Sequence, residues 1–107
     1  SKAVNFKSSY TWRLFEIMVS WAQDKKLTGG VLTGWFSVSV DELRQQLGMP
    51  DSYLWVNVDR TIEASVKELR EKARIHTKIE RIKTSRKITH LRFEFIEDLQ
   101  QDLLEGV

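Results

Sequence analysis

Two β-prone runs, at residues 75–83 and 87–96, follow each other near the end of this chain with only a short turn segment between them. In the second run Leu91, Phe93 and Phe95 alternate with polar residues, which is the period of a strand with one buried face. Strands this close in sequence pair as an antiparallel hairpin. The chain is therefore predicted to carry a β-hairpin towards its C-terminal end, which restricts the folds it can adopt.

A long helix is predicted immediately before this hairpin, with its start inside residues 52–58. Its inward stripe consists of Val58, Ile62, Ser65, Val66, Leu69 and Ala73. Steps of three and four residues keep such side chains on one helix face. Glu63 and Lys67 form an i, i+4 pair in the favourable order. Glu68 and Lys72 form a second, and each pair contributes about 0.2–0.5 kcal/mol.

A first helix is predicted over residues 9–24, with Ser8 or Ser9 as its N-cap. Its apolar side chains recur at helical spacing, at Tyr10, Leu14, Ile17, Met18, Trp21 and Ala22. A second apolar stripe on the same helix consists of Trp12, Phe15 and Val19. Two apolar faces are equally consistent with a central core helix and with a helix that docks a neighbouring domain.

Between these helices the chain is predicted to form a loop, a short strand and a short helix. The residues that predict a flexible loop are Lys25, Lys26, Gly29, Gly30 and Gly34. Residues 35–38 are β-prone. Ser39 and Glu42 then have the spacing of a capping box, and Gly48 and Pro50 end the helix that it begins. The inward residues of this helix are Leu43 and Leu47.

The predicted order is helix, short strand, helix, helix and hairpin, with a short acidic helix or a frayed end over residues 97–105. This order is that of an α+β winged helix-turn-helix. In that fold the third helix can enter the major groove of DNA, and the hairpin, or wing, contacts the backbone or the minor groove. A chain of 107 residues is long enough for one such domain with one modest core.

Charge is distributed unevenly along the chain. Residues 67–92 carry ten Lys or Arg and three acids, residues 1–66 carry seven of each, and residues 94–107 carry five acids and no base. The formal net charge of +2 therefore conceals a strongly basic segment on the third helix and the hairpin. Positive charge held on a folded scaffold is what binding to a phosphate backbone requires. These patterns favour a DNA-binding module.

Two groups of candidate contact residues follow from this interpretation. The base-reading candidates on the third helix are Asn57, Arg60, Thr61, Ala64 and Lys67. Arginine pairs with guanine, asparagine pairs with adenine, and the methyl groups of threonine and alanine contact that of thymine. A solvated helix face explains any single position equally well, but the set together favours base reading.

Phosphate contacts are predicted for the cations of the hairpin and for the residues before the first helix. The phosphate candidates are Lys7, Ser8, Lys78, Arg81, Lys83, Arg86, Lys87 and Arg92. Before the first helix, a hydroxyl, an ammonium group and free helix-end amides are available to an anion. Charged hairpin edges also prevent strand-to-strand aggregation, which accounts for one or two of these cations but not for the cluster.

The composition disfavours other classes of protein. The absence of cysteine excludes disulfides and thiolate zinc sites and suits a reducing cytoplasm. No apolar run approaches the roughly 20 residues that span a bilayer, and the N-terminus has no signal-peptide pattern. His76 and His90 lack nearby carboxylates, so no metal site or other cofactor is predicted. No set of catalytic residues is found, and the chain is not expected to be an enzyme.

Four segments resemble one known family, in the order that this family has. Residues 9–18 are similar to the S-x-Y-x-x-R-L-Y-E-L-L start of the second winged-helix domain in iteron-binding plasmid replication initiators of the Rep_3 type. Residues 36–48 resemble its strand and EL+xxLG helix, and residues 60–69 its R-x-V-L-x-x-A-x-x-E-I recognition helix. Residues 85–95 resemble its G-R-K-V-x-x-L-x-F-x-I wing. The resemblance covers about residues 6–96.

The resemblance implies a cytoplasmic, plasmid-encoded bacterial protein that binds repeated origin sites (iterons) in double-stranded DNA and starts replication without catalysing a reaction. It implies a first winged-helix domain for dimerisation, dimers that limit copy number, and host replication proteins as partners. The DNA-facing positions that it carries over are Lys7, Ser8, Arg60, Thr61, Ala64 and Lys67. The resemblance implies an initiator with two winged-helix domains. The sequence opens at Ser1 without methionine, and residues 1–107 are expected to be a fragment of such a longer protein.

Two positions depart from the family pattern. Ser85 stands where the wing usually has glycine, and residues 53–57 are more apolar than the usual entry into the recognition helix. The absent first domain favours the docking interpretation of the second stripe on the first helix. Two alternatives to an initiator are a winged helix that binds proteins through Trp12, Phe15 and Trp55, and a transcription regulator of similar fold.

Overall fold

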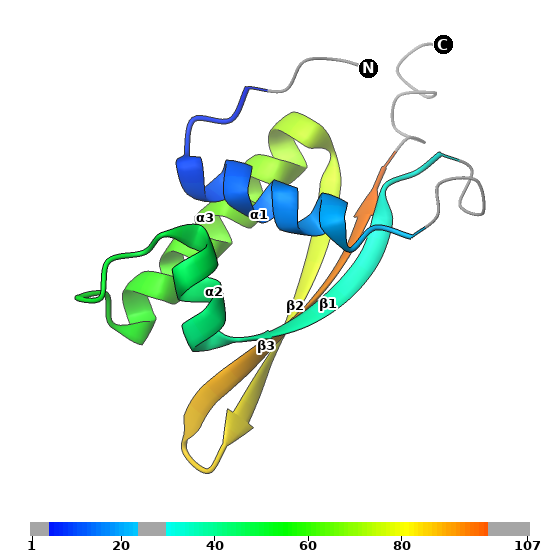
Figure 1. Cartoon of the computed structure of the whole chain (residues 1–107). Coiled ribbons are helices and arrows are strands. Elements are labelled where there is room, and N and C mark those ends of the chain that lie inside the picture. Colours follow the sequence, from blue (N-terminus) through cyan, green and yellow to red (C-terminus); the bar gives the residue numbers. More distant parts are fainter. Residues whose placement is uncertain (1–4, 24–29, 99–107) are drawn as a thin grey trace.

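The computed structural model describes residues 5–23 and 30–98 (Figure 1). Within these ranges its elements are α1 (Ser9–Ser20), β1 (Thr33–Ser39), α2 (Val40–Leu47), α3 (Trp55–Ala73), β2 (Ile75–Thr84) and β3 (Lys87–Glu97). The strands form one antiparallel sheet in the order β1-β3-β2. The helices gather on one face of this sheet, and the far end of the β2–β3 hairpin extends beyond them (Figure 1). The predicted α+β winged helix-turn-helix is confirmed.

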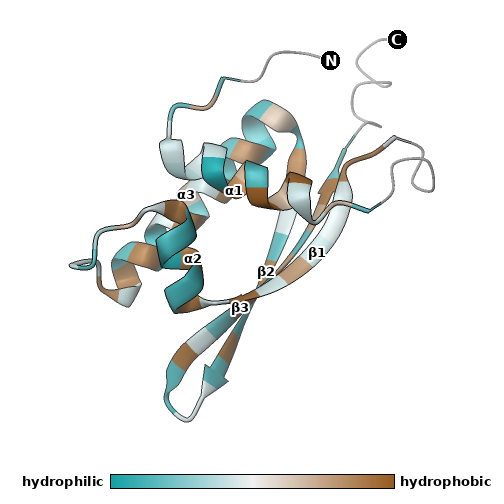
Figure 2. Cartoon of the chain, in the orientation of Figure 1, coloured by the Kyte–Doolittle hydropathy of each residue, from teal (hydrophilic) through white to brown (hydrophobic). Residues whose placement is uncertain are grey.

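The alternation of side chains along the strands explains this layering. On β3 Leu91, Phe93 and Phe95 are buried as predicted, and hydrophobic residues alternate with hydrophilic ones along the hairpin (Figure 2). Phe36 of β1 lies opposite Phe93, and their rings stack with centroids 4.8 Å apart. The helices complete the core with Leu14, Met18, Leu43, Leu47, Val58, Ile62 and Leu69. Each such side chain, fully buried, contributes about 1.5–3 kcal/mol.

Helix α1 begins where predicted but ends earlier. Ser8 is its N-cap, and the Ser8 Oγ accepts a hydrogen bond of 3.1 Å from an amide of the first turn. The prediction extended this helix to residue 24, whereas it ends at Ser20. Trp21 and Ala22, which were assigned to its apolar stripe, lie beyond its end because the chain turns there to run beside the sheet.

Gly34 lies within β1, not in the loop predicted around it, and β1 is correspondingly longer than residues 35–38. Ala22 is bridged to Gly34 across the sheet edge. A Cβ on Gly34 would lie 2.7 Å from the carbonyl oxygen of Trp21 and 2.9 Å from the ring of Phe95. The glycine is therefore needed for close packing, not for a turn. Residues 24–29 of the predicted loop lie outside the described residues. The predicted acidic end lies outside them from residue 99 onwards.

The short helix α2 has the predicted signals at both ends. The Ser39 Oγ accepts a hydrogen bond of 3.1 Å from the Glu42 amide, as half of the predicted capping box. The Glu42 carboxylate is bonded to Gln46 Nε2 at 3.3 Å, one turn further on. Gly48 ends the helix with a φ of 72°, and an added Cβ there would also meet the guanidinium of Arg13 at 2.0 Å.

Helix α3 begins at Trp55, inside the predicted interval, and runs directly into the hairpin. The hairpin turn consists of Ser85 and Arg86, which link the paired residues Thr84 and Lys87. Ser85 has a φ of 60°, a left-handed conformation that glycine adopts at lower cost than other residues. This conformation explains why glycine is usual at this position in the family that the wing resembles.

Candidate nucleic-acid interface

Helix α3 directs cationic side chains away from the core. Val58 and Ile62 on its inner face are fully buried, whereas Arg60, Ala64 and Lys67 are exposed. Within the part of the chain that the structure describes, the side chains of Arg60 and Lys67 form no hydrogen bond or ion pair. These three predicted base-reading residues therefore lie on the face that a DNA groove can reach.

The other two base-reading candidates are engaged with the backbone of their own helix. The Asn57 Oδ1 accepts a hydrogen bond of 3.0 Å from the amide of Leu54, the residue before the helix. The Thr61 Oγ1 donates to the carbonyl oxygen of Asn57 at 2.8 Å. Both residues are half-buried. Bidentate pairing with adenine needs the carboxamide oxygen. In this structure that oxygen is bonded to the Leu54 amide, so Asn57 serves as a cap for α3. The apolar side chain of Leu54 cannot provide a cap.

The wing places three further cations beside the start of α3. Lys83, Arg86 and Lys87 are exposed, and their side chains have no hydrogen-bond or ion-pair partner among the described residues. They border an open cleft of about 590 Å³ between the wing and the helix-turn-helix. Its other walls are α2 and the segment that leads into α3, which contribute Val40, Asp41, Arg44, Tyr53, Leu54 and Trp55. This cleft can hold a phosphate backbone between the wing and α3.

Arg81 joins the wing to α3 and is not free to bind phosphate. Its Nε donates to the Asp59 Oδ1 at 3.0 Å, and its Nη2 lies 3.6 Å from the Glu63 carboxylate. Two acids of α3 thus neutralise this guanidinium and hold β2 against the helix. The contact of Glu63 with Arg81 replaces the predicted pairing of Glu63 with Lys67, because β2 brings Arg81 to the same side of α3.

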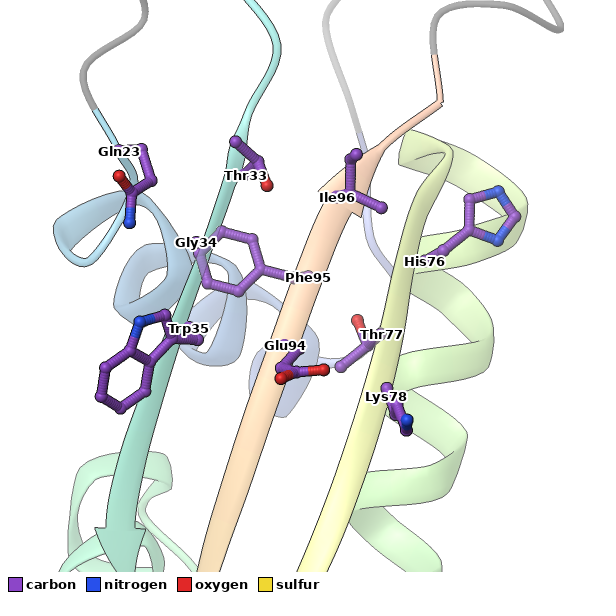
Figure 3. Close-up of a pocket in the computed structure, with 10 residues that line it drawn as sticks. All are labelled: Gln23, Thr33, Gly34, Trp35, His76, Thr77, Lys78, Glu94, Phe95 and Ile96. Carbon is purple, nitrogen blue, oxygen red and sulfur yellow. The ribbon is translucent and has the colours of Figure 1, made fainter. Parts of the chain in front are cut away.

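Lys78 and Arg92 lie on the opposite face of the sheet, which the helices do not cover. Figure 3 views this face with the helices behind the strands, and Lys78 lies there beside Glu94, which separates it from Trp35. The Arg92 guanidinium stacks 4.3 Å from the centroid of the Trp35 ring and forms a 3.2 Å ion pair with Glu94. These two cations therefore do not join those of α3 and the wing.

The segment before α1 is bound by Glu68 of α3. The amides of Lys7 and Ser8 and the Thr11 hydroxyl all donate to its carboxylate, the hydroxyl at 2.6 Å. The Lys72 ammonium completes the set at 2.8 Å, which confirms the predicted pair with Glu68. The expectation of free helix-end amides here is wrong, because a carboxylate distant in sequence already occupies these amides. The Ser8 hydroxyl is likewise used as the cap of α1.

These contacts shift the pKa of Glu68. Burial opposes its ionisation, but the hydrogen bonds from Lys72, Thr11, Lys7 and Ser8 outweigh that cost and lower the pKa to about 2. The carboxylate is therefore charged at neutral pH and serves as an anchor between α1 and α3.

Sequence reasoning missed Arg44, which holds the turn of the helix-turn-helix. Its Nη2 donates to the carbonyl oxygens of Asp51, at 3.2 Å, and of Tyr53. Arg44 thereby satisfies acceptors that a tight turn leaves unpaired and fixes the direction in which α3 begins. A basic residue in the last turn of α2 was the available signal, since such residues commonly bind carbonyl groups at helix ends.

Other kinds of site are not seen in the described residues. None of the helices there has the length and apolar character needed to cross a membrane. No group of three or more His, Cys, Asp or Glu side chains there has the arrangement of a metal site.

A helix-turn-helix that presents unpaired cations on its third helix, beside a basic wing, defines a winged-helix domain of the DNA-binding class. Comparison with protein families agrees with this class. A family described as "Initiator Rep protein, WH2" matches residues 39–95, from the cap of α2 to the end of the core in β3. The chain belongs to this family of replication initiators, and membership implies DNA binding in the initiation of replication. A search of curated proteins gave no match.

Proposed function

We propose that this domain binds repeated sites (iterons) in double-stranded DNA at a plasmid origin, with sequence specificity, and thereby starts plasmid replication. The observation that carries the proposal is the set of unpaired cations shared by α3 and the wing. Arg60 and Lys67 belong to α3, and Lys83, Arg86 and Lys87 border the cleft beside its start. Family membership supplies the biological context, and the resemblance described above supplies the repeated sites.

In this proposal the two elements have different tasks. Arg60, near the N-terminal end of α3, donates two hydrogen bonds to a guanine edge in the major groove. The wing cations bind phosphates and supply affinity that depends on salt but not on sequence. Arg81 and Arg44 contact no DNA and position the wing and α3.

A selection of bound duplexes from a random pool tests this function. The expected result is one enriched motif that recurs as direct repeats near the encoding gene. Recovery of all sequences with equal efficiency would contradict sequence-specific binding. Enrichment of a motif that occurs once, without repeats, would retain DNA binding but overturn the origin role.

We further propose that a first winged-helix domain and host replication proteins bind this domain through apolar surface on α1. Trp12 and Val19 remain 38% and 48% exposed, although Phe6 covers part of the stripe with its ring 4.8 Å from that of Trp12. The affinity of apolar docking should change little between about 50 and 200 mM salt, whereas the affinity for phosphates falls steeply over that range. Loss of partner binding in Trp12→Ala, with DNA binding retained, is the expected result. A partner affinity that falls as steeply with salt as DNA binding would contradict it.

A further inference from the structure

Two of the most exposed apolar side chains in the described part of the chain lie two residues apart at the start of α3. Leu54 is 69% exposed and Val56 is 55% exposed, while Trp55 between them packs against the core. A single exposed apolar residue is ordinary. Two at the tip of the helix that faces DNA need a separate explanation.

Neither side chain contributes to folding in a way that accounts for its identity. Leu54 occupies the N-cap position, where Ser, Thr, Asp or Asn is favoured, and its side chain has no oxygen to accept a hydrogen bond from a first-turn amide. Val56 is a β-branched residue in the first turn of a helix and is mostly outside the core. More polar residues at both positions would suit the isolated fold better.

Their surroundings are cationic. Val56 lies one turn before Arg60, so both side chains project from the same face of α3. Leu54 borders the cleft that also contains Lys83, Arg86 and Lys87 of the wing. The apolar pair therefore lies between cations suited to phosphates, at the end of the helix that reaches base edges.

We infer that Leu54 and Val56 read thymine, by contact with its C5-methyl group in the major groove. This methyl is the apolar group that base edges present in that groove, and apolar side chains recognise it. The inference rests on the proposed function and adds a base preference to it. It also assigns the apolar character of residues 53–57, unusual for this helix entry, to specificity.

The test replaces each thymine of the selected duplex in turn with deoxyuridine, which keeps the hydrogen-bonding edge and lacks only the methyl. Affinities are measured at fixed salt for the wild type, Leu54→Ala and Val56→Ala. The matched control is Ile96→Ala, the loss of an apolar side chain that is 53% exposed on the sheet face that the helices do not cover. Circular dichroism verifies that each variant is folded.

At one or two thymines, deoxyuridine should lower wild-type affinity about threefold to fivefold, the effect of one buried methyl. Leu54→Ala or Val56→Ala should lose this sensitivity, while Ile96→Ala should keep it. The inference would be overturned if deoxyuridine changed the affinity at no thymine position, or lowered it equally in all variants. Sequence-specific binding would remain intact in either case. Equal loss by Val56→Ala on selected and random duplexes would overturn it too. If no sequence is enriched at all, the proposed function fails, and this inference with it.

Discussion

Glu68 and Arg81 anchor α3 from opposite sides. Glu68 of α3 binds the segment that leads into α1. Arg81 of β2 binds Asp59 of α3. The pairing of Glu68 with Lys72 follows from local spacing, and it is found at 2.8 Å. The contact of Glu68 with Thr11 and that of Arg81 with Asp59 join residues far apart in sequence, which local patterns do not reveal.

Glu68 should make stability depend on pH in the acidic range. Its pKa falls from an ordinary 4.5 to about 2 on folding, so its contribution is complete above about pH 4.5 and is lost as pH falls towards 2. Glu68→Gln is expected to cost about 2–3 kcal/mol of unfolding free energy at pH 7, as an upper range for a partly exposed site. Urea unfolding at pH 7 and pH 3 measures this cost. Glu71→Gln, an exposed acid of the same helix, is the control, and a Glu68→Gln cost independent of pH would contradict the prediction.

Arg60 should discriminate between bases. Arg60→Ala is expected to weaken binding to the selected duplex by about 1–3 kcal/mol and to relax preference at one base pair. The reason is that a bidentate pair with guanine is lost, while the phosphate contacts of the wing remain. Titration against the selected duplex, a random duplex and duplexes changed at single positions measures the effect. Equal weakening on all of them would exclude base reading by Arg60.

Arg81 should affect the position of the wing and not the number of phosphates bound. Arg81→Ala is expected to lower stability by about 0.5–1.5 kcal/mol, because a partly exposed, hydrogen-bonded ion pair with Asp59 is lost. The dependence of DNA affinity on salt should stay unchanged. Thermal unfolding and a salt titration of the same variant measure both quantities. A salt slope lower by one unit would show that Arg81 binds a phosphate after all.

At the scale of elements, the wing combines two surfaces with different chemistry. Its helix-side face carries Lys83 above the cleft, while its outer face carries Lys78 and an Arg92 that is stacked on Trp35. Hairpin and turn were predicted from composition and alternation. The division of the cations between two faces was not, because the prediction treated them as one cluster.

This division predicts different salt responses along one hairpin. Lys83→Ala, Arg86→Ala and Lys87→Ala should each lower the slope of log affinity against log salt by about one unit, on selected and random duplexes alike. Lys78→Ala, the matched control on the outer face, should leave the slope unchanged. Fluorescence anisotropy titrations between about 50 and 200 mM salt measure the slopes. If Lys78→Ala gives the same decrease as the others, DNA contacts the outer face instead.

At the scale of the whole molecule, the helices cover one face of the sheet and leave the other open (Figure 1). The open face presents Trp35 and Ile96, 49% and 53% exposed, together with the ion pair of Arg92 and Glu94 along β3. The helix side holds the core, the turn fixed by Arg44 and the unpaired cations. The surface proposed for DNA and the open sheet face therefore lie on opposite sides of the sheet.

The amino-acid sequence by itself determined the order of the elements, the caps at Ser8, Ser39 and Gly48, and the outward position of Arg60. These depend on spacings of a few residues, which set helix faces, strand alternation and turns before any distant contact forms. Only the tertiary structure decided where α1 ends, that Glu68 takes the amides before α1, and which hairpin cations lie beside α3. Those outcomes depend on which face of the sheet the helices cover and on carboxylates brought in from distant parts of the chain.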